Sequence, residues 1–182
     1  MKKIFLLMCA ITSFTLFGQK FTLTPEGFVN TDDTSKKYVV LEFPGKSQEE
    51  LYNSFLINLN KRYKSAKNVI SSVAPSIITI NAKSANPIRR TSMHSFTNEY
   101  TETISFKDGK VKVDAPIFKL FTTDYGKRQE MYLKAGFSID GSSFGIFDKK
   151  GKVKYEKAVE DLNNFANELL DYLKKSEEEQ EW

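Results

Sequence analysis

Cysteine and histidine are almost absent from this 182-residue chain, which contains one of each. Cys9 lies inside an apolar run at the N-terminus, and His94 lies near the middle of the sequence. Without further thiols, the folded body has no disulfide framework. The common zinc sites, which combine several Cys and His ligands, are excluded as well. We therefore predict no metal site and no cofactor.

Motifs that mark enzymes and ion-binding proteins are also missing or misplaced. No glycine-rich loop precedes a helix as in a phosphate-binding site, and Asp32-Asp33 lacks the spacing of a calcium loop. Residues 141–145, Gly-Ser-Ser-Phe-Gly, match the nucleophile-elbow pattern but lie in a turn-rich stretch without the required strand-to-helix setting. We predict no catalytic residue, and a hydrolase that uses Ser143 or carboxylates stays as an alternative.

The first eighteen residues have the layout of a secretory signal peptide. Met1-Lys2-Lys3 is basic, Ile4 to Phe17 is an almost uncharged apolar run, and Gly18 is a small residue at the expected cut. The run is shorter than the ~20 residues of a comfortable membrane span. Cys9 is not preceded by the small residue that lipidation requires. We expect residues 1–18 to be removed, with no transmembrane segment left, and the protein to be periplasmic or secreted.

Two segments carry helical periodicity. Ser47 and Glu50 fit a capping box, in which each side chain satisfies a free backbone N–H of the other residue. The apolar stripe of the first helix consists of Leu51, Phe55, Leu59 and Tyr63. The second helix runs from about Tyr155 to Lys175 with Ala158, Leu162, Phe165, Leu169, Tyr172 and Leu173 on one face. Both helices should therefore bury one face.

Alternation of apolar and polar residues predicts strands around and between these helices. The strands cover residues 38–43, 69–73, 77–80 and 95–107. Asp108-Gly109 is a hairpin turn, and the returning strand places Val111, Val113, Ala115 and Ile117 on its apolar side. Residues 118–148 have no clean period, and we expect one further hairpin-like piece there, with Phe144, Ile146 and Phe147 before a turn at 148–151.

This order of elements predicts an α+β fold, β-α-β-β-β-β-α, with a curved antiparallel sheet and both helices packed on one face. A single domain spans residues 38–175, and a chain of this length can bury one adequate core. Residues 19–37 form an N-terminal arm with a short strand at 21–24. Residues 176–182 form an acidic tail.

The segments around the first helix and the hairpin resemble a known family. The similar segments are Val39-Val40-Leu41-Glu42-Phe43-Pro44-Gly45-Lys46-Ser47, running into Glu49-Glu50-Leu51-Tyr52, and Thr103-Ile104-Ser105-Phe106-Lys107-Asp108-Gly109-Lys110. They are similar to domain-of-unknown-function family 4468, which occurs in exported proteins of Bacteroidetes. The resemblance covers about Tyr38 to Pro116 and implies a TATA-binding-protein-like (TBP-like) fold. It implies no activity, so no functional residue is transferred from it.

One side of the long strand is hydrated and is the candidate binding surface. We call the sheet surface that bears it the open face, and its candidate residues are Thr97, Glu99, Thr101, Thr103, Lys110 and Lys112. A polar face is common in antiparallel sheets and needs no function. The functional alternative is a peptide, glycan or protein that docks there. Because this face lacks the apolar wedges of minor-groove binders, we expect no nucleic-acid ligand.

Three isolated polar residues are candidate reactive groups. Asn98 and Glu102 fall on the apolar side of the long strand. A buried Glu102 with a shifted pKa would be a site candidate, but we favour a bulge or a sheet margin that keeps it hydrated. We expect His94, at the edge of a strand, to be a surface residue.

The sequence therefore predicts an exported envelope protein without assigned activity, a non-enzymatic binding or structural module. Its partner would be another envelope protein, a glycan or a second copy of the chain in a homodimer. A small-ligand carrier that uses the aromatic-rich stretch Phe118 to Phe147 is the second alternative.

Overall fold

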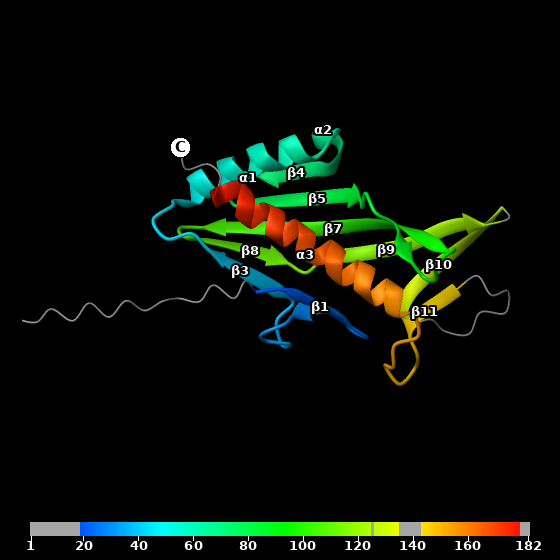
Figure 1. Ribbon diagram of the computed structural model, residues 1–182. Helices are drawn as coiled ribbons and strands as arrows, with labels where there is room; N and C mark the ends of the chain where they lie inside the picture. Colours follow the sequence, from blue (N-terminus) through cyan, green and yellow to red (C-terminus); the bar gives the residue numbers. More distant parts are fainter. Residues whose placement is uncertain (1–18, 125, 135–142, 179–182) are drawn as a thin grey trace, which may run out of the picture.

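The computed structural model, shown in Figure 1, describes residues 19–124, 126–134 and 143–178. The predicted signal peptide and residues 179–182 of the predicted tail lie outside the described residues. The helices are α1 (Gln48–Arg62), α2 (Ala66–Val69) and α3 (Glu156–Glu178). The strands are β1 (Phe21–Thr24), β2 (Gly27–Asn30), β3 (Tyr38–Glu42), β4 (Ile70–Val73), β5 (Ile77–Lys83), β6 (Ile88–Arg89), β7 (Ser95–Lys107), β8 (Lys110–Asp114), β9 (Ile117–Asp124), β10 (Lys127–Lys134) and β11 (Ser143–Phe147).

The main sheet is built around β7, its longest strand. The strands follow the order β11-β10-β9-β7-β5-β4 across the sheet. β8 also pairs with β7, beside its C-terminal half, while β9 pairs with its N-terminal half. β3 continues the sheet from β8. Because β10 and β11 run parallel and the other neighbours run antiparallel, the sheet is mixed but mostly antiparallel.

Both long helices cover the same face of the sheet (Figure 1), as the amphipathic stripes predict. Phe55 of α1 contacts Phe106 with ring centroids 5.4 Å apart. Phe165 of α3 contacts Tyr100 at 4.7 Å. Phe106 and Tyr100 alternate in phase along β7 and therefore point to the same side. The predicted α+β architecture with two helices on one face is confirmed.

The first helix begins where its sequence signals place it. The Glu50 amide donates to Ser47 Oγ at 3.3 Å, and the Ser47 amide donates to Glu50 Oε2 at 2.8 Å. This reciprocal capping box satisfies two backbone donors that the helix itself leaves free. Leu51, Phe55 and Leu59 are fully buried on the sheet side.

The segment expected to be an arm, residues 19–37, contains the antiparallel β1–β2 hairpin. Its Phe21, Leu23 and Phe28 side chains belong to the common core. The free edge of β1 is bonded to side chains of α3: the Phe21 amide donates to Asn167 Oδ1 at 2.9 Å and the Leu23 amide to Asn163 Oδ1 at 2.8 Å. The distance between Asn163 and Asn167 along α3 matches the distance between Phe21 and Leu23 along β1, because four helical residues rise about 6 Å and two strand residues about 6.6 Å.

The strand that returns from the Asp108-Gly109 turn is shorter than predicted. β8 ends at Asp114, and Ala115-Pro116 separates it from β9. Phe118, rather than Ile117, then lies opposite Tyr100 on the helix side. The prediction that Ile117 shares the apolar side of Val111 is therefore wrong, and Ile117 is 72% exposed. A one-residue change of phase moves every following side chain to the other face.

The aromatic-rich stretch forms more strands than predicted. β9 and β10 make an antiparallel hairpin, and Gly126 adopts a φ of +74° in its turn. β11 contains Phe144, Ile146 and Phe147, as expected, and Phe147 bridges Val153 in antiparallel fashion across the turn at 148–151, so the predicted hairpin-like piece is present. β11 also pairs in parallel with β10, which was not predicted. At the C-terminal end, α3 continues to Glu178, into the predicted tail.

Candidate ligand-binding cleft

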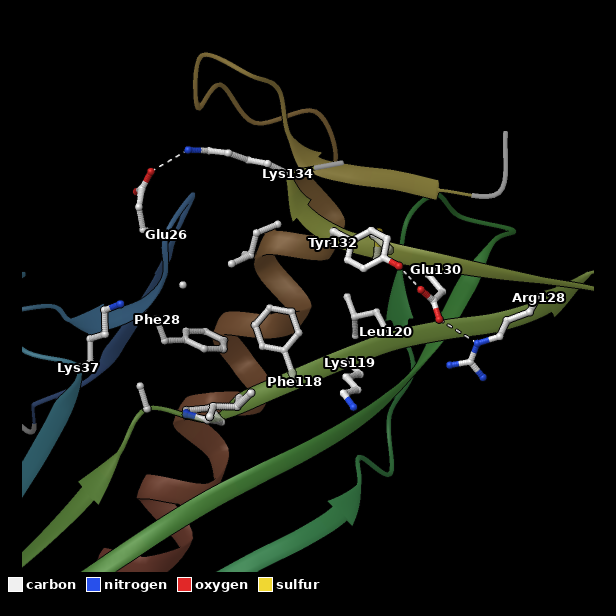
Figure 2. Close-up of a pocket in the computed structure, with 16 residues that line it drawn as sticks. Glu26, Phe28, Lys37, Phe118, Lys119, Leu120, Arg128, Glu130, Tyr132 and Lys134 are labelled. Atoms are coloured by element: carbon white, nitrogen blue, oxygen red, sulfur yellow. Dashed lines mark hydrogen bonds and ion pairs between the residues drawn. The ribbon is translucent and has the colours of Figure 1, made fainter. Parts of the chain in front are cut away.

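A cavity of about 890 Å³ opens where β9 and β10 separate. The two strands pair from the Asp124 and Lys127 end up to Leu120 and Met131. Beyond that point β10 stays paired with β11, while β9 follows β7. The turn of the β1–β2 hairpin forms the third side of the cavity, and α3 runs behind it (Figure 2). We call this cavity the cleft.

The inner walls of the cleft are apolar. They consist of Phe28, Phe118, Leu120, Met131 and Leu133. Phe118 and Leu120 lie opposite Tyr100 and Asn98, so they face the helix side of the sheet. Phe28 meets Phe118 edge to face with ring centroids 5.6 Å apart. The cleft therefore continues from the open face toward the hydrophobic core.

Charged side chains surround the mouth (Figure 2). Lys134 Nζ lies 2.8 Å from Glu26 Oε1, which connects the end of β10 to the hairpin turn. Arg128 Nε donates to Glu130 Oε1 at 2.9 Å, and the Tyr132 hydroxyl donates to Glu130 Oε2. These bonds, first that from Tyr132 and then that from Arg128, lower the pKa of Glu130. Glu130 is therefore held as a carboxylate.

The hairpin turn that carries Glu26 is positioned by close packing. Gly27 adopts a φ of +112°, a conformation that glycine accepts readily. Gly151, with a φ of +84°, lies against Pro25 so closely that an added Cβ would stand 3.2 Å from Pro25 Cγ. The turn after β11 and the β1–β2 turn therefore fix one wall of the cleft relative to the other.

The structure places all six candidate residues of the open face on one side of the sheet. Thr97, Glu99, Thr101 and Thr103 alternate with the buried residues of β7, and Lys110 and Lys112 follow on β8. Their charges are largely matched within the sheet: Lys83 lies 3.2 Å from Glu99, Lys110 lies 3.1 Å from Glu42, and Lys112 lies 2.7 Å from Asp114. Their role in binding stays a prediction.

The open face also carries apolar side chains that the sequence analysis did not place there. Ile117 is 72% exposed, Val73 is 67% exposed and Tyr132 is 46% exposed. Phe121 lies on the same side, with Arg128 Cζ 4.2 Å from its ring centroid and Lys83 Nζ 5.8 Å from it. The expectation that this face lacks apolar side chains is therefore corrected, because β4, β9 and β10 add them. The absence of a nucleic-acid ligand stays a prediction.

His94 and Ser143 do not form a nucleophile–base pair. Both ring nitrogens of His94 are buried without a hydrogen-bond partner among the described residues. Its ring packs on Phe96 at 4.9 Å and on Phe144 at 5.9 Å, so the prediction of a surface histidine is wrong. Ser143 begins β11 beside Phe144, yet no hydrogen bond joins it to His94 in the described ranges. A base that activates a serine must contact it.

Glu102 is buried in the centre of the sheet, opposite Ile80. It is 1% exposed, and the neighbouring Asn98 is fully buried. The prediction of a bulge or a sheet margin is therefore wrong. Burial raises the pKa of Glu102 from 4.5 to about 8, although the charge of Arg62 opposes the shift. Glu102 is not among the residues that line the cleft, so it belongs to the core.

Over the described ranges, no three His, Cys, Asp or Glu side chains gather as a metal site would require. The same part of the chain contains no helix with the length and apolar character needed to cross a membrane.

Comparison with known proteins identifies the fold. Neither a family model nor a curated protein matches the sequence. Among solved structures, a TBP-like protein from Parabacteroides distasonis is 14% identical, with a TM-score of 0.52 over 75% of this chain and 90% of that one. A DUF4468 family protein from Bacteroides ovatus is also 14% identical, with a TM-score of 0.54 over 76% of this chain and 83% of that one. The fold is therefore TBP-like, and these neighbours match the family that the sequence resembles.

Proposed function

We propose that this chain is an exported, non-enzymatic binding protein that holds a small, largely apolar ligand in the cleft. The observation that carries the proposal is the cleft itself, about 890 Å³ with apolar inner walls. That volume lies within the roughly 300–1,000 Å³ typical of small-molecule sites. The cleft also lies in the aromatic-rich stretch that the sequence analysis connected with a small-ligand carrier.

The apolar walls favour a bound ligand over water in the cleft. Phe118 and Leu133 are only partly buried, so part of their apolar surface faces water in the cleft. A ligand that fills the space would remove their apolar surface from water, which stabilises the complex. The described residues that line the cleft include no His, Ser or Cys. The two carboxylates among them, Glu26 and Glu130, are already paired with cations. These features favour binding over catalysis.

A neutral fluorescent probe tests the proposal. We expect N-phenyl-1-naphthylamine to gain fluorescence with the wild-type protein, because its rings would enter the apolar part of the cleft. Leu133→Trp should fill the cleft and abolish the gain. Ile77→Trp introduces the same indole at an exposed apolar position outside the cleft and should retain the fluorescence gain. Equal fluorescence in both variants, at unchanged urea midpoints, would contradict a ligand site in the cleft.

Export forms part of the proposal because of the layout of residues 1–18. Cell fractionation with an antibody to the protein should recover a shortened chain, without these residues, outside the cytoplasm. A full-length chain in the cytoplasmic fraction would reject export without affecting the cleft.

A second candidate function is contact with another copy or an envelope protein through the open face. The exposed Ile117 and Val73 side chains favour it. Sedimentation should then show a dimer for the wild type and a monomer for Ile117→Lys. A wild-type monomer at high concentration would remove the homodimer.

A further inference from the structure

Building on the proposed function, we infer that the cleft binds a single-chain amphiphile with a carboxylate head group. The alkyl chain would lie against the apolar inner walls, and the carboxylate would lie at the mouth between Lys37 and Lys119. The ligand class follows from the combination of an apolar interior with an excess of cations at the entrance.

Among the residues that the structure describes, the mouth has more cations than acidic side chains to pair with them. Lys37, Lys119, Arg128 and Lys134 contribute to it, as do Glu26 and Glu130. Lys134 pairs with Glu26, and Arg128 pairs with Glu130. Among the described residues, Lys37 forms no ion pair. Lys119 lies opposite Glu99 of β7, but Glu99 pairs with Lys83, and Lys119 acts on Glu130 through its charge at longer range. Two ammonium groups are therefore available to an anionic ligand.

These two lysines stand on either side of Phe118 in Figure 2. Lys37 precedes β3, and its carbonyl oxygen accepts from the Ala115 amide at 2.8 Å, which fixes its backbone at the β8–β9 junction. Lys119 lies on β9, one residue beyond Phe118, and its side chain is exposed. Both side chains are exposed, that of Lys37 just before β3 and that of Lys119 on β9. Because lysine side chains are long and flexible, their ammonium groups can approach one head group from two sides.

The other classes of head group fit the mouth less well. A quaternary ammonium group would meet the unpaired charges of Lys37 and Lys119. A neutral alcohol would leave both lysines without a charged partner. An anionic bilayer would approach Glu26 and Glu130 as well as the lysines, and like charges oppose that contact. A monomeric long-chain carboxylate is the ligand whose charge and shape match the cleft.

Isothermal titration with three ligands of equal chain length provides the test. Laurate, dodecanol and dodecyltrimethylammonium are titrated below their aggregation limits into the wild-type protein. We expect laurate to bind at least about tenfold more tightly than dodecanol, because charge-assisted contacts are stronger than neutral ones. The Lys37→Gln/Lys119→Gln double variant should lose that preference and keep its dodecanol affinity. Lys107→Gln, an exposed lysine outside the cleft, is the matched control and should behave like the wild type.

The outcomes separate this inference from the proposal on which it rests. If dodecanol binds as tightly as laurate and the double variant changes neither affinity, the head-group assignment is overturned while the apolar ligand site stands. If no alkyl ligand binds and Leu133→Trp changes nothing, both are overturned. Binding to phosphatidylglycerol vesicles without binding of free laurate would also overturn the inference, because the ligand would then be a membrane surface.

Discussion

The two halves of β7 have different surroundings, and the difference shows how one sheet provides both a scaffold and a cavity. In the C-terminal half, Ile104 lies between β5 and β8, and Phe106 lies between β8 and the turn that precedes β5. Both are at most 2% exposed. Phe106 contacts two rings of α1, those of Tyr52 and Phe55. The N-terminal half is flanked by β9, whose Phe118 is only partly buried and lines the cleft.

The break between β8 and β9 produces this difference. Both strands pair with the same side of β7, one after the other, with Ala115-Pro116 between them. β3 pairs with β8 before this junction, and β10 pairs with β9 after it. No strand therefore bridges the junction among the described pairings. Proline has no N–H to donate to a neighbouring strand. The sheet therefore stays open at the junction, and the β1–β2 hairpin covers only part of the gap.

The largest expected effect comes from truncating one phenylalanine that packs beside each half of β7, Phe55 of α1 or Phe118 of β9. Phe55→Ala should lower the free energy of unfolding by about 3–5 kcal/mol, because it leaves a cavity in a filled core. Phe118→Ala should cost less than about 2 kcal/mol, because its ring is partly exposed and borders an existing cavity. Urea denaturation of both variants checks the comparison. Equal losses would mean that the cleft is packed as tightly as the scaffold.

The next effect concerns pH and the buried carboxyl of β7. Burial raises the pKa of Glu102 from 4.5 to about 8, so its contribution to stability is complete below pH 4.5 and is lost as the pH rises toward 8. Glu102→Gln cannot titrate and should be the more stable protein at pH 8.5, by an amount on the order of a few kcal/mol. Thermal denaturation between pH 5 and pH 9 would show this as a flatter profile for the variant.

Glu99→Gln is the matched control for this prediction, since Glu99 lies three residues away on the hydrated side of the same strand and is partly exposed. Its stability profile should follow that of the wild type. If Glu102→Gln also follows the wild type, Glu102 is not a buried neutral acid.

The sequence predicts the scaffold half better than the cleft half, for identifiable reasons. The first helix has both residues of its capping box, and its buried residues Leu51, Phe55 and Leu59 recur every four positions. In β9 and β10 the alternation is blurred because apolar Phe121 lies on the open face while polar Gln129 lies on the helix side. Alternation in sequence cannot predict a sheet whose two faces are both partly apolar.

The cleft itself could not be predicted from local patterns. Its walls come from β2, β9 and β10, and it exists because β8 and β9 follow one another along β7. Pro116 is the local signal for the break, because a proline inside an apparent strand favours an interruption there. Placing the break before Ile117 would also have given the correct phase for Phe118.

The third prediction concerns the attachment of the hairpin that bounds the cleft. Asn167→Ala should lower the free energy of unfolding by about 1–3 kcal/mol, because the partly buried Phe21 amide loses its acceptor. Hydrogen exchange of the Phe21 amide should accelerate with it. Asn164→Ala, on the same helix, is the control. If the two variants behave alike, α3 does not hold the hairpin through its amide side chains.

The smallest effect belongs to the ion pair at the mouth of the cleft. Glu26 and Lys134 are 67% and 40% exposed, so a double-mutant cycle with Glu26→Gln and Lys134→Gln should give a coupling of at most about 1 kcal/mol that falls at high salt. The pair of Arg89 with Asp161 provides the contrast. Asp161 is only 12% exposed, and it accepts from both the backbone amide and the guanidinium of Arg89. Its coupling should be larger and less sensitive to salt. If the Glu26–Lys134 coupling equals that of Arg89–Asp161, the mouth of the cleft is held closed rather than loosely bridged, and ligand entry should then accelerate in the Glu26→Gln variant.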